Sequence, residues 1–135
     1  MESKIFPATL SSLDEVMNYF RNAYIGVSLP KKEKMKFELA FEEAVVNIIN
    51  YAYQTPDGKI EVSCKYDSES RTLIAEIKDS GQPFNPLDLD KIQRPNSLEN
   101  QPVGGLGIHF MKELVDTIEY AYREGKNILT IHKKV

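Results

Sequence analysis

Two polar residues with complementary chemistry stand four positions apart in a stretch of helical character. Glu43 and Asn47 share one face of that helix, because positions i and i+4 are neighbours on a helix surface. A carboxylate there can act as a general base, and a carboxamide oxygen can ligate Mg²⁺, which prefers oxygen ligands. The alternative is a solvated helix edge, where both residue types are common. Glu42 points away from this face and is the weaker candidate for a base.

A second pair of candidates directly follows a predicted strand. Asp79 and Gly81 belong to the sequence Asp-Ser-Gly-Gln-Pro-Phe. A carboxylate at a strand end can accept a hydrogen bond from an exocyclic amine such as that of adenine, and a glycine lets a flat ring approach the backbone closely. An ordinary turn that uses Asp and Gly explains the same residues equally well.

A third candidate is a glycine run that opens a short helix predicted over 108–115. The run consists of Gly104, Gly105, Leu106 and Gly107. Successive glycines let backbone N–H groups turn towards a phosphate, and a helix N-terminus favours an anion. The spacing is neither the G-x-G-x-x-G fingerprint nor a Walker A loop. A glycine hinge without a ligand is the alternative, and it explains one glycine better than three.

Hydropathy patterning predicts the elements that must position these residues. Helical periodicity predicts a helix after a cap at Ser11 or Ser12 and a long helix over 31–53. Hydropathy patterning also predicts five strands, at 4–8, 59–66, 72–78, 117–122 and 127–132. The first of them contains a proline and is therefore expected at a sheet edge. This order predicts an α+β fold, a two-layer α/β sandwich with a mixed, mostly antiparallel sheet and helices on one face.

Length and composition predict an ordinary globular protein. The 135 residues are expected to form a single domain, residues 1–135, with 41% hydrophobic and 27% charged residues. A net charge of −3 disfavours direct nucleic-acid binding. The single cysteine, Cys64, excludes an internal disulfide and a cysteine metal cluster, and His109 and His132 are too few for a metal site. No secretory signal or apolar span is recognised, so we expect a soluble, cytoplasmic protein without membrane contact.

Three segments, taken together and in order, resemble the motifs of the GHKL ATPases, the superfamily of gyrase, heat-shock chaperone, histidine-kinase and mismatch-repair ATPases. Residues 41–53 resemble the N box, residues 79–84 the G1 box, and residues 104–116 the G2 box. The short chain, the Gly-Gly-Leu-Gly-Ile run and the final Asn-Ile-Leu-Thr-Ile-His-Lys-Lys are most similar to bacterial anti-sigma-factor serine/threonine kinases. The fold that the resemblance implies is the Bergerat ATP-binding sandwich.

The resemblance also implies a role for each candidate residue, with ATP and Mg²⁺ as the ligands. Glu43 matches the general base and Asn47 the Mg²⁺ ligand. Asp79 matches the adenine-binding carboxylate, and Gly81 the glycine beside the base. The phosphate loop is matched by Gly104, Gly105, Leu106 and Gly107, and residues 87–103 match the lid over the nucleotide. Apart from the resemblance, Lys91 and Arg94 are most simply a solvated loop surface, and contact of one of them with a γ-phosphate is the alternative.

The implied activity is that of an anti-sigma factor and protein serine kinase, which phosphorylates an anti-sigma-factor antagonist and so regulates transcription. The implied partners are a sigma factor and a STAS-type antagonist, and a homodimer is expected. Alternatives are a nucleotide-binding interaction module without kinase turnover, or a degenerate sensor-kinase ATPase domain. The chain departs from many relatives at two places: Asn50-Tyr51 replaces a basic residue, and Asn127-Ile128 replaces a Gly-Thr pair.

Overall fold

The computed structural model of this chain describes residues 2–53, 57–85, 87 and 111–135. A 3₁₀ turn at Leu10–Ser12 leads into the first of the helices, which are α1 (Leu13–Ala23) and α2 (Lys31–Tyr51). The strands are β1 (Ser3–Pro7), β2 (Lys59–Asp67), β3 (Thr72–Asp79), β4 (Thr117–Arg123) and β5 (Lys126–Lys134). Residues 111–114 are helical as well. The predicted strands and the two predicted N-terminal helices are therefore confirmed in type, with bounds that move by no more than two residues.

The strands form a five-stranded sheet in the order β1-β2-β3-β5-β4. Every neighbouring pair among these strands is antiparallel, so the part of the sheet that the structure describes is antiparallel rather than mixed. Connectivity explains this result, because short hairpins join β2 to β3 and β4 to β5 and so reverse the chain direction. β1 lies at a sheet edge, as its proline predicted.

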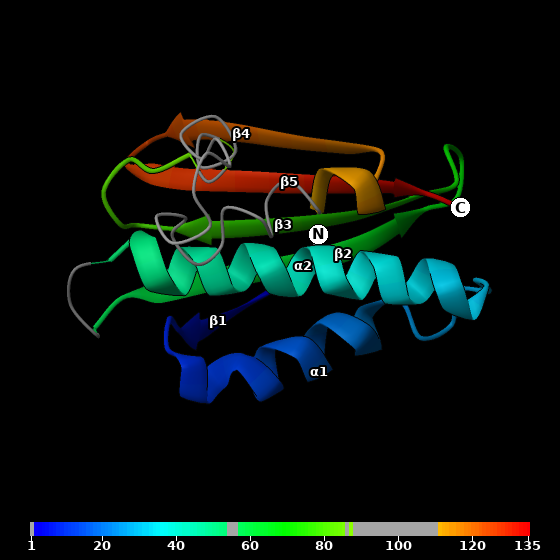
Figure 1. Cartoon of the computed structure of the whole chain (residues 1–135), viewed down its shortest axis with the longest axis horizontal. Helices are drawn as coiled ribbons and strands as arrows, with labels where there is room; N and C mark the ends of the chain where they lie inside the picture. Colours follow the sequence, from blue (N-terminus) through cyan, green and yellow to red (C-terminus); the bar gives the residue numbers. More distant parts are fainter. Residues whose placement is uncertain (1, 54–56, 86, 88–110) are drawn as a thin grey trace, which may run out of the picture.

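One face of the sheet carries both helices, as predicted (Figure 1). Alternation along the strands turns a set of apolar side chains towards them, namely Ile60, Val62, Leu73, Ala75, Ile77, Leu129 and Ile131, all buried. The opposing residues of α2 recur at helical spacing and are also buried: Phe37, Phe41, Val45 and Ile48. The core therefore fills the space between the sheet and the helix that carries Glu43 and Asn47.

One contact joins α2 to α1, and another joins α2 to the sheet. The ring of Phe20 in α1 stacks on that of Phe41 in α2, with centroids 3.7 Å apart. Lys133 Nζ lies 2.6 Å from Glu33 Oε2, which joins the far end of β5 to the first turn of α2. The C-terminal end of α2 consequently lies at the end of the sheet where β3 stops (Figure 1).

The N-cap predicted for α1 is confirmed in position, but the expected side-chain capping hydrogen bond is not formed. Ser12 is the N-cap residue, but its side chain makes no capping hydrogen bond. Its hydroxyl instead pairs with Thr9 Oγ1 at 3.0 Å. The 3₁₀ turn before α1 explains the difference, because it keeps Ser12 in a helical backbone conformation, whereas a capping side chain normally extends from β-like backbone.

Candidate functional site

Glu43 and Asn47 lie together on α2, as their spacing predicts. The Asn47 amide Nδ2 donates to the Glu43 carbonyl oxygen at 2.8 Å and to Glu43 Oε1 at 3.2 Å. Asn47 is fully buried. Both donated bonds run back along the helix, so the amide nitrogen faces Glu43 and the amide oxygen is turned away from it.

The Asn47 amide oxygen is available to a ligand. Oδ1 is buried and has no hydrogen-bond partner among the residues that the structure describes. A buried polar atom without a partner costs about 1–3 kcal/mol, so such an atom in a folded protein calls for an explanation. Carboxamide oxygens are typical ligands of hard cations. The donor set at Asn47 therefore fits the Mg²⁺ that the sequence predicted there.

The Glu43 carboxylate stands at the margin of the core. Burial raises the pKa of this carboxyl above its usual 4.5, the hydrogen bond from Asn47 lowers it in part, and the neighbouring charge of Glu42 raises it. A raised pKa brings a carboxylate closer to the range in which general bases work best near neutral pH. The position and the environment of Glu43 both suit the role of a proton acceptor.

Asp79 ends β3 with its side chain on the helix-covered face, 3% exposed. Its Oδ1 accepts hydrogen bonds from the Gly81 backbone N–H at 2.9 Å and from Asn127 Nδ2 at 2.8 Å. Its Oδ2 is buried and has no partner within the described part of the chain. Burial raises the pKa of Asp79, and the bonds from Asn127 and Gly81 lower it. Oδ1 thus already accepts two hydrogen bonds, and Oδ2 can accept a hydrogen bond from an amine.

Gly81 is required by a close approach that the sequence did not predict. A Cβ at this position would lie 2.3 Å from the Ala52 carbonyl oxygen, at the C-cap of α2. The next residue, Gln82, donates its N–H to the same oxygen at 3.2 Å. The Asp79 turn therefore rests against the end of α2, and Ala52 is five residues, or about 7.5 Å along a helix axis, from Asn47. Whether a flat ring also approaches Gly81 stays a prediction.

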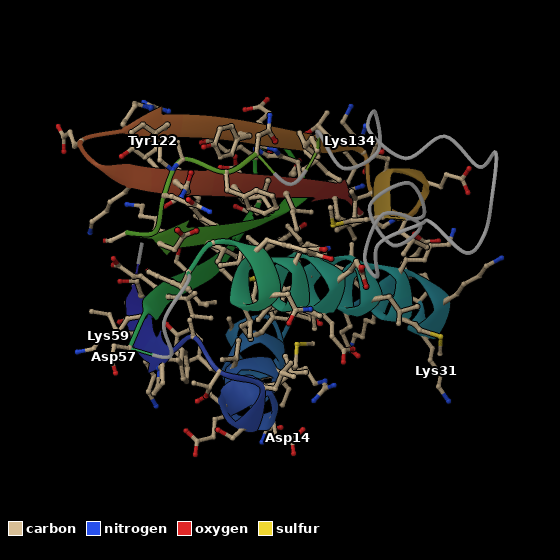
Figure 2. All side chains as sticks on the ribbon, turned by 60° about the vertical axis from the view of Figure 1, so that its left-hand side comes forward. Asp14, Lys31, Asp57, Lys59, Tyr122 and Lys134 are labelled. Carbon is tan, nitrogen blue, oxygen red and sulfur yellow. The ribbon has the colours of Figure 1, made fainter. Side chains whose placement is uncertain are left out.

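Asn127 is the site residue that sequence reasoning did not identify. It lies at the start of β5, 3% exposed, directly opposite Asp79 in the β3–β5 ladder. It also pairs with Tyr122 of β4, which Figure 2 shows at the end of the hairpin far from Lys134. The one sequence feature that could have pointed to Asn127 is that it stands where many relatives have a Gly-Thr pair. Its contact with Asp79 could not be predicted, because the two residues are 48 positions apart in the chain.

Tyr53 is a second residue that joins parts of this end of the molecule. Its hydroxyl accepts a hydrogen bond from the Ser80 N–H at 2.8 Å and donates one to the Lys59 carbonyl at 2.6 Å. Its ring lies over Gly58, where a Cβ would come within 2.3 Å of the ring carbons. Tyr53 therefore holds the start of the Asp79 turn against the start of β2.

The remaining predicted site residues lie outside the described residues. They are Gly104, Gly105, Leu106 and Gly107. The same holds for Lys91 and Arg94 and for the predicted lid after Leu87. Their roles stay predictions.

The described residues thus place two unpartnered acceptor oxygens at neighbouring parts of one sheet end. Asn47 Oδ1 suits a hard cation, and Asp79 Oδ2 suits an amine donor.

None of the helices in the described part of the chain combines the length and the apolar character that a bilayer span requires.

Comparison with known proteins points to one kind of domain. The family model described as "Histidine kinase-like ATPase domain" matches residues 6–133. The serine-protein kinase RsbW of Bacillus mycoides is 29% identical over 115 residues, which cover 78% of this chain and 66% of that protein. The serine/threonine-protein kinase BtrW of Bordetella bronchiseptica is 26% identical over 100 residues, which cover 73% of this chain and 70% of that protein.

Solved structures agree on the fold. The structure of the RsbU and RsbW domains of Rv1364c from Mycobacterium tuberculosis matches 99% of this chain and 32% of that one, with a TM-score of 0.66 at 16% identity. The catalytic domain of histidine kinase ThkA matches with a TM-score of 0.52 and covers 99% of this chain. These likenesses show the fold alone, and this chain spans about two thirds of the length of the RsbW relatives.

Proposed function

Since this chain belongs to the histidine kinase-like ATPase domain family, we propose that it binds ATP with Mg²⁺ and transfers the terminal phosphate to a serine of a partner protein. The observation that carries the proposal is the pair of buried acceptors, Asn47 Oδ1 and Asp79 Oδ2, which lack hydrogen-bond partners among the described residues. A bound nucleotide and its metal ion would supply the contacts that these two buried oxygens lack.

Asp79 would recognise the adenine base. Its Oδ2 is a hydrogen-bond acceptor when the carboxyl is ionised, and the 6-amino group of adenine is a donor. The Gly81 N–H holds the other oxygen and keeps the side chain turned in one direction. Adenine would therefore bind beside the turn that packs against the end of α2.

Asn47 and Glu43 would serve the phosphate end of the nucleotide. Asn47 would hold Mg²⁺ through Oδ1, and the bound ion would neutralise charge on the phosphate oxygens. Glu43 would accept the proton of the attacking serine hydroxyl on a carboxylate oxygen. The bond from Asn47 Nδ2 to Glu43 Oε1 orients the Glu43 side chain for this transfer. The glycines of residues 104–107 would supply backbone N–H groups to the phosphates.

The serine kinases RsbW and BtrW support the class of reaction by their similarity. We propose that the phosphate acceptor is a STAS-type anti-sigma-factor antagonist and that a sigma factor is the alternative partner. The chain would act in the cytoplasm as a homodimer and regulate transcription through these two partners.

The experiment is a phosphotransfer assay with Mg·ATP and a purified STAS-type antagonist from the same organism, with serine phosphorylation measured by mass spectrometry. Glu43→Gln should bind ADP like the parent but transfer phosphate about 10²- to 10⁴-fold more slowly, because general-base catalysis contributes about that factor. Glu42→Gln is the matched control: it removes the smallest of the influences on the Glu43 pKa and should slow transfer far less than Glu43→Gln does.

The outcomes separate the candidate functions. Binding of ATP without transfer by the parent would favour a nucleotide-binding interaction module. An active Glu43→Gln variant would contradict the assigned base while leaving nucleotide binding in place. A parent that binds no nucleotide would contradict the proposal as a whole.

A further inference from the structure

Asn127 uses every hydrogen-bonding position of its side chain. Nδ2 donates to Asp79 Oδ1 at 2.8 Å and to the Gln82 carbonyl oxygen at 2.9 Å. Oδ1 accepts from the Phe84 N–H at 3.0 Å and from the Tyr120 hydroxyl. An asparagine amide offers two donors and two lone pairs, so nothing on this side chain is left over for a ligand. Asn127 acts only on the groups around it.

These four bonds allow a single orientation of the amide. Turning it over would place the amide oxygen against the Asp79 carboxylate and the Gln82 carbonyl, so three acceptors would meet without a donor between them. It would also set the NH₂ group against the Phe84 N–H. Unmade buried bonds cost about 1–3 kcal/mol each, so the observed orientation is strongly preferred. Asn127 is therefore a rigid donor aimed at Asp79.

The rigid donor decides which oxygen of Asp79 stays open. Oδ1 receives both Asn127 Nδ2 and the Gly81 N–H, and exchanging the two oxygens would break both bonds. Oδ2 is left as a buried acceptor without a partner among the described residues. The same donor favours the ionised carboxylate, because a hydrogen bond to the charged form lowers the pKa that burial raises. An ionised oxygen accepts a hydrogen bond and cannot donate one.

We propose that Asn127 is a positioning residue that sets the base specificity of the nucleotide site, by holding Asp79 as a pure acceptor that selects a 6-amino purine over a 6-oxo purine. This inference rests on the proposed function, since it assigns the residue that tunes the same site. The 6-oxo group of hypoxanthine or guanine is an acceptor and would face the fixed Asp79 Oδ2 without a proton between them. Without Asn127 the Gly81 N–H is the remaining donor to Asp79 among the described residues, so the carboxyl turns and takes up a proton more readily, and it can then donate to a 6-oxo group.

A purely structural role makes a different prediction. Asn127 also ties β5 to the backbone of residues 82–84, so its loss would loosen that segment. Loosening weakens the binding of every nucleotide by a similar factor. Positioning of Asp79 instead changes the ratio between nucleotides that differ only at purine position 6.

The experiment is calorimetric titration of the full chain with Mg·ADP and Mg·IDP, which carries a carbonyl oxygen where ADP has the amine. The parent should prefer ADP by on the order of 10-fold or more, because a site built to pair with a donor rejects an analogue that lacks it. Asn127→Leu keeps the approximate volume and removes the bonds. We expect it to lower this preference by about 10-fold, mainly through weaker ADP binding.

Two further variants complete the test. Tyr120→Phe removes one bond to Asn127 but leaves the contact with Asp79, so its preference for ADP should match that of the parent. Asn127→Thr retains one side-chain donor in a residue that suits a strand, and it should give an intermediate preference even where the leucine variant does not fold.

A preference for ADP that survives in every folded Asn127 variant, with both nucleotides weakened equally, would make the residue structural and overturn the inference. A parent that binds ADP and IDP equally would overturn it too, although nucleotide binding itself would stand. A parent that binds neither would contradict the proposed function and, with it, this inference.

Discussion

The Asp79 carboxylate shows how a buried charge at the proposed nucleotide site lowers stability. It is 3% exposed, and one of its oxygens has no partner in the part of the chain that the structure describes. Desolvation disfavours the charged form, which is why its pKa is raised above the usual 3.8. A group whose folded pKa exceeds its unfolded pKa binds protons more tightly when folded. The free energy of unfolding therefore falls as pH rises through that interval.

We predict that Asp79→Asn separates stability from binding. The new amide keeps a carbonyl oxygen for Gly81 and Asn127 and removes the buried charge. The variant should therefore be more stable than the parent at pH 7–8, by on the order of 1 kcal/mol. The difference should shrink as pH falls through the raised folded pKa of Asp79 and level off well below 3.8, where the parent carboxyl is protonated in both states. Urea unfolding at several pH values measures it. A variant that is less stable at every pH would contradict the account of Asp79 as a costly buried charge.

At the scale of elements, the end of α2 and the turn after β3 meet at one carbonyl group. The Ala52 oxygen receives the Gln82 N–H and lies against Gly81. This contact places the segment that carries Asp79 beside the helix that carries Asn47. The two halves of the proposed site thus depend on the absence of a side chain at position 81.

We predict that Gly81→Ala forces these elements apart. The added Cβ would lie 2.3 Å from a backbone oxygen, which cannot move aside as a flexible side chain can. We expect a loss of about 1–3 kcal/mol in the free energy of unfolding, as for other overpacked contacts, together with weaker ADP binding.

Gly26→Ala is the matched control for this prediction. No heavy atom of the described structure lies within 4 Å of a Cβ at Gly26, so the change should be neutral or stabilise by up to about 1 kcal/mol. Urea denaturation of both variants makes the comparison. Equal effects at the two glycines would show that the Ala52 contact is unimportant.

At the scale of the whole molecule, the proposed ligand would connect elements that are distant in the sequence. Asn47 comes from α2, Asp79 from β3, and Asn127 supports Asp79 from β5. Lys133 and Glu33 join β5 to α2 at the opposite end of the same helix. A nucleotide that binds only the folded arrangement should therefore stabilise the domain as one cooperative unit.

We predict that Mg·ADP at 100 times its dissociation constant raises the free energy of unfolding by about 2.7 kcal/mol. At the same concentration Asp79→Asn should gain only about 0.3–1.4 kcal/mol, because a lost charged hydrogen bond weakens binding by roughly 10- to 150-fold. Chemical denaturation with and without ligand gives both values. Equal stabilisation of parent and variant would place the nucleotide away from Asp79.

Local sequence was enough to predict most of the elements. Alternation along most of β2 and β3 and helical spacing in α2 appear within windows of a few residues, so the local sequence indicates which face of each segment is buried. The residues of the proposed site were also visible, because Glu43 and Asn47 are one helical turn apart and Asp79 ends an alternating segment.

The tertiary structure alone decided which atoms of these residues are free. An oxygen is unpartnered only after every neighbour has been considered, and the neighbours of Asp79 and Gly81 come from Asn127 and Ala52, far away in the chain. The sequence therefore determined which chemical groups the site contains. Strand register and helix docking determined that Asp79 Oδ1 accepts two hydrogen bonds while Oδ2 has no partner among the described residues. The reason is that hydrogen bonding of a buried atom depends on the whole surrounding fold and not on local spacing.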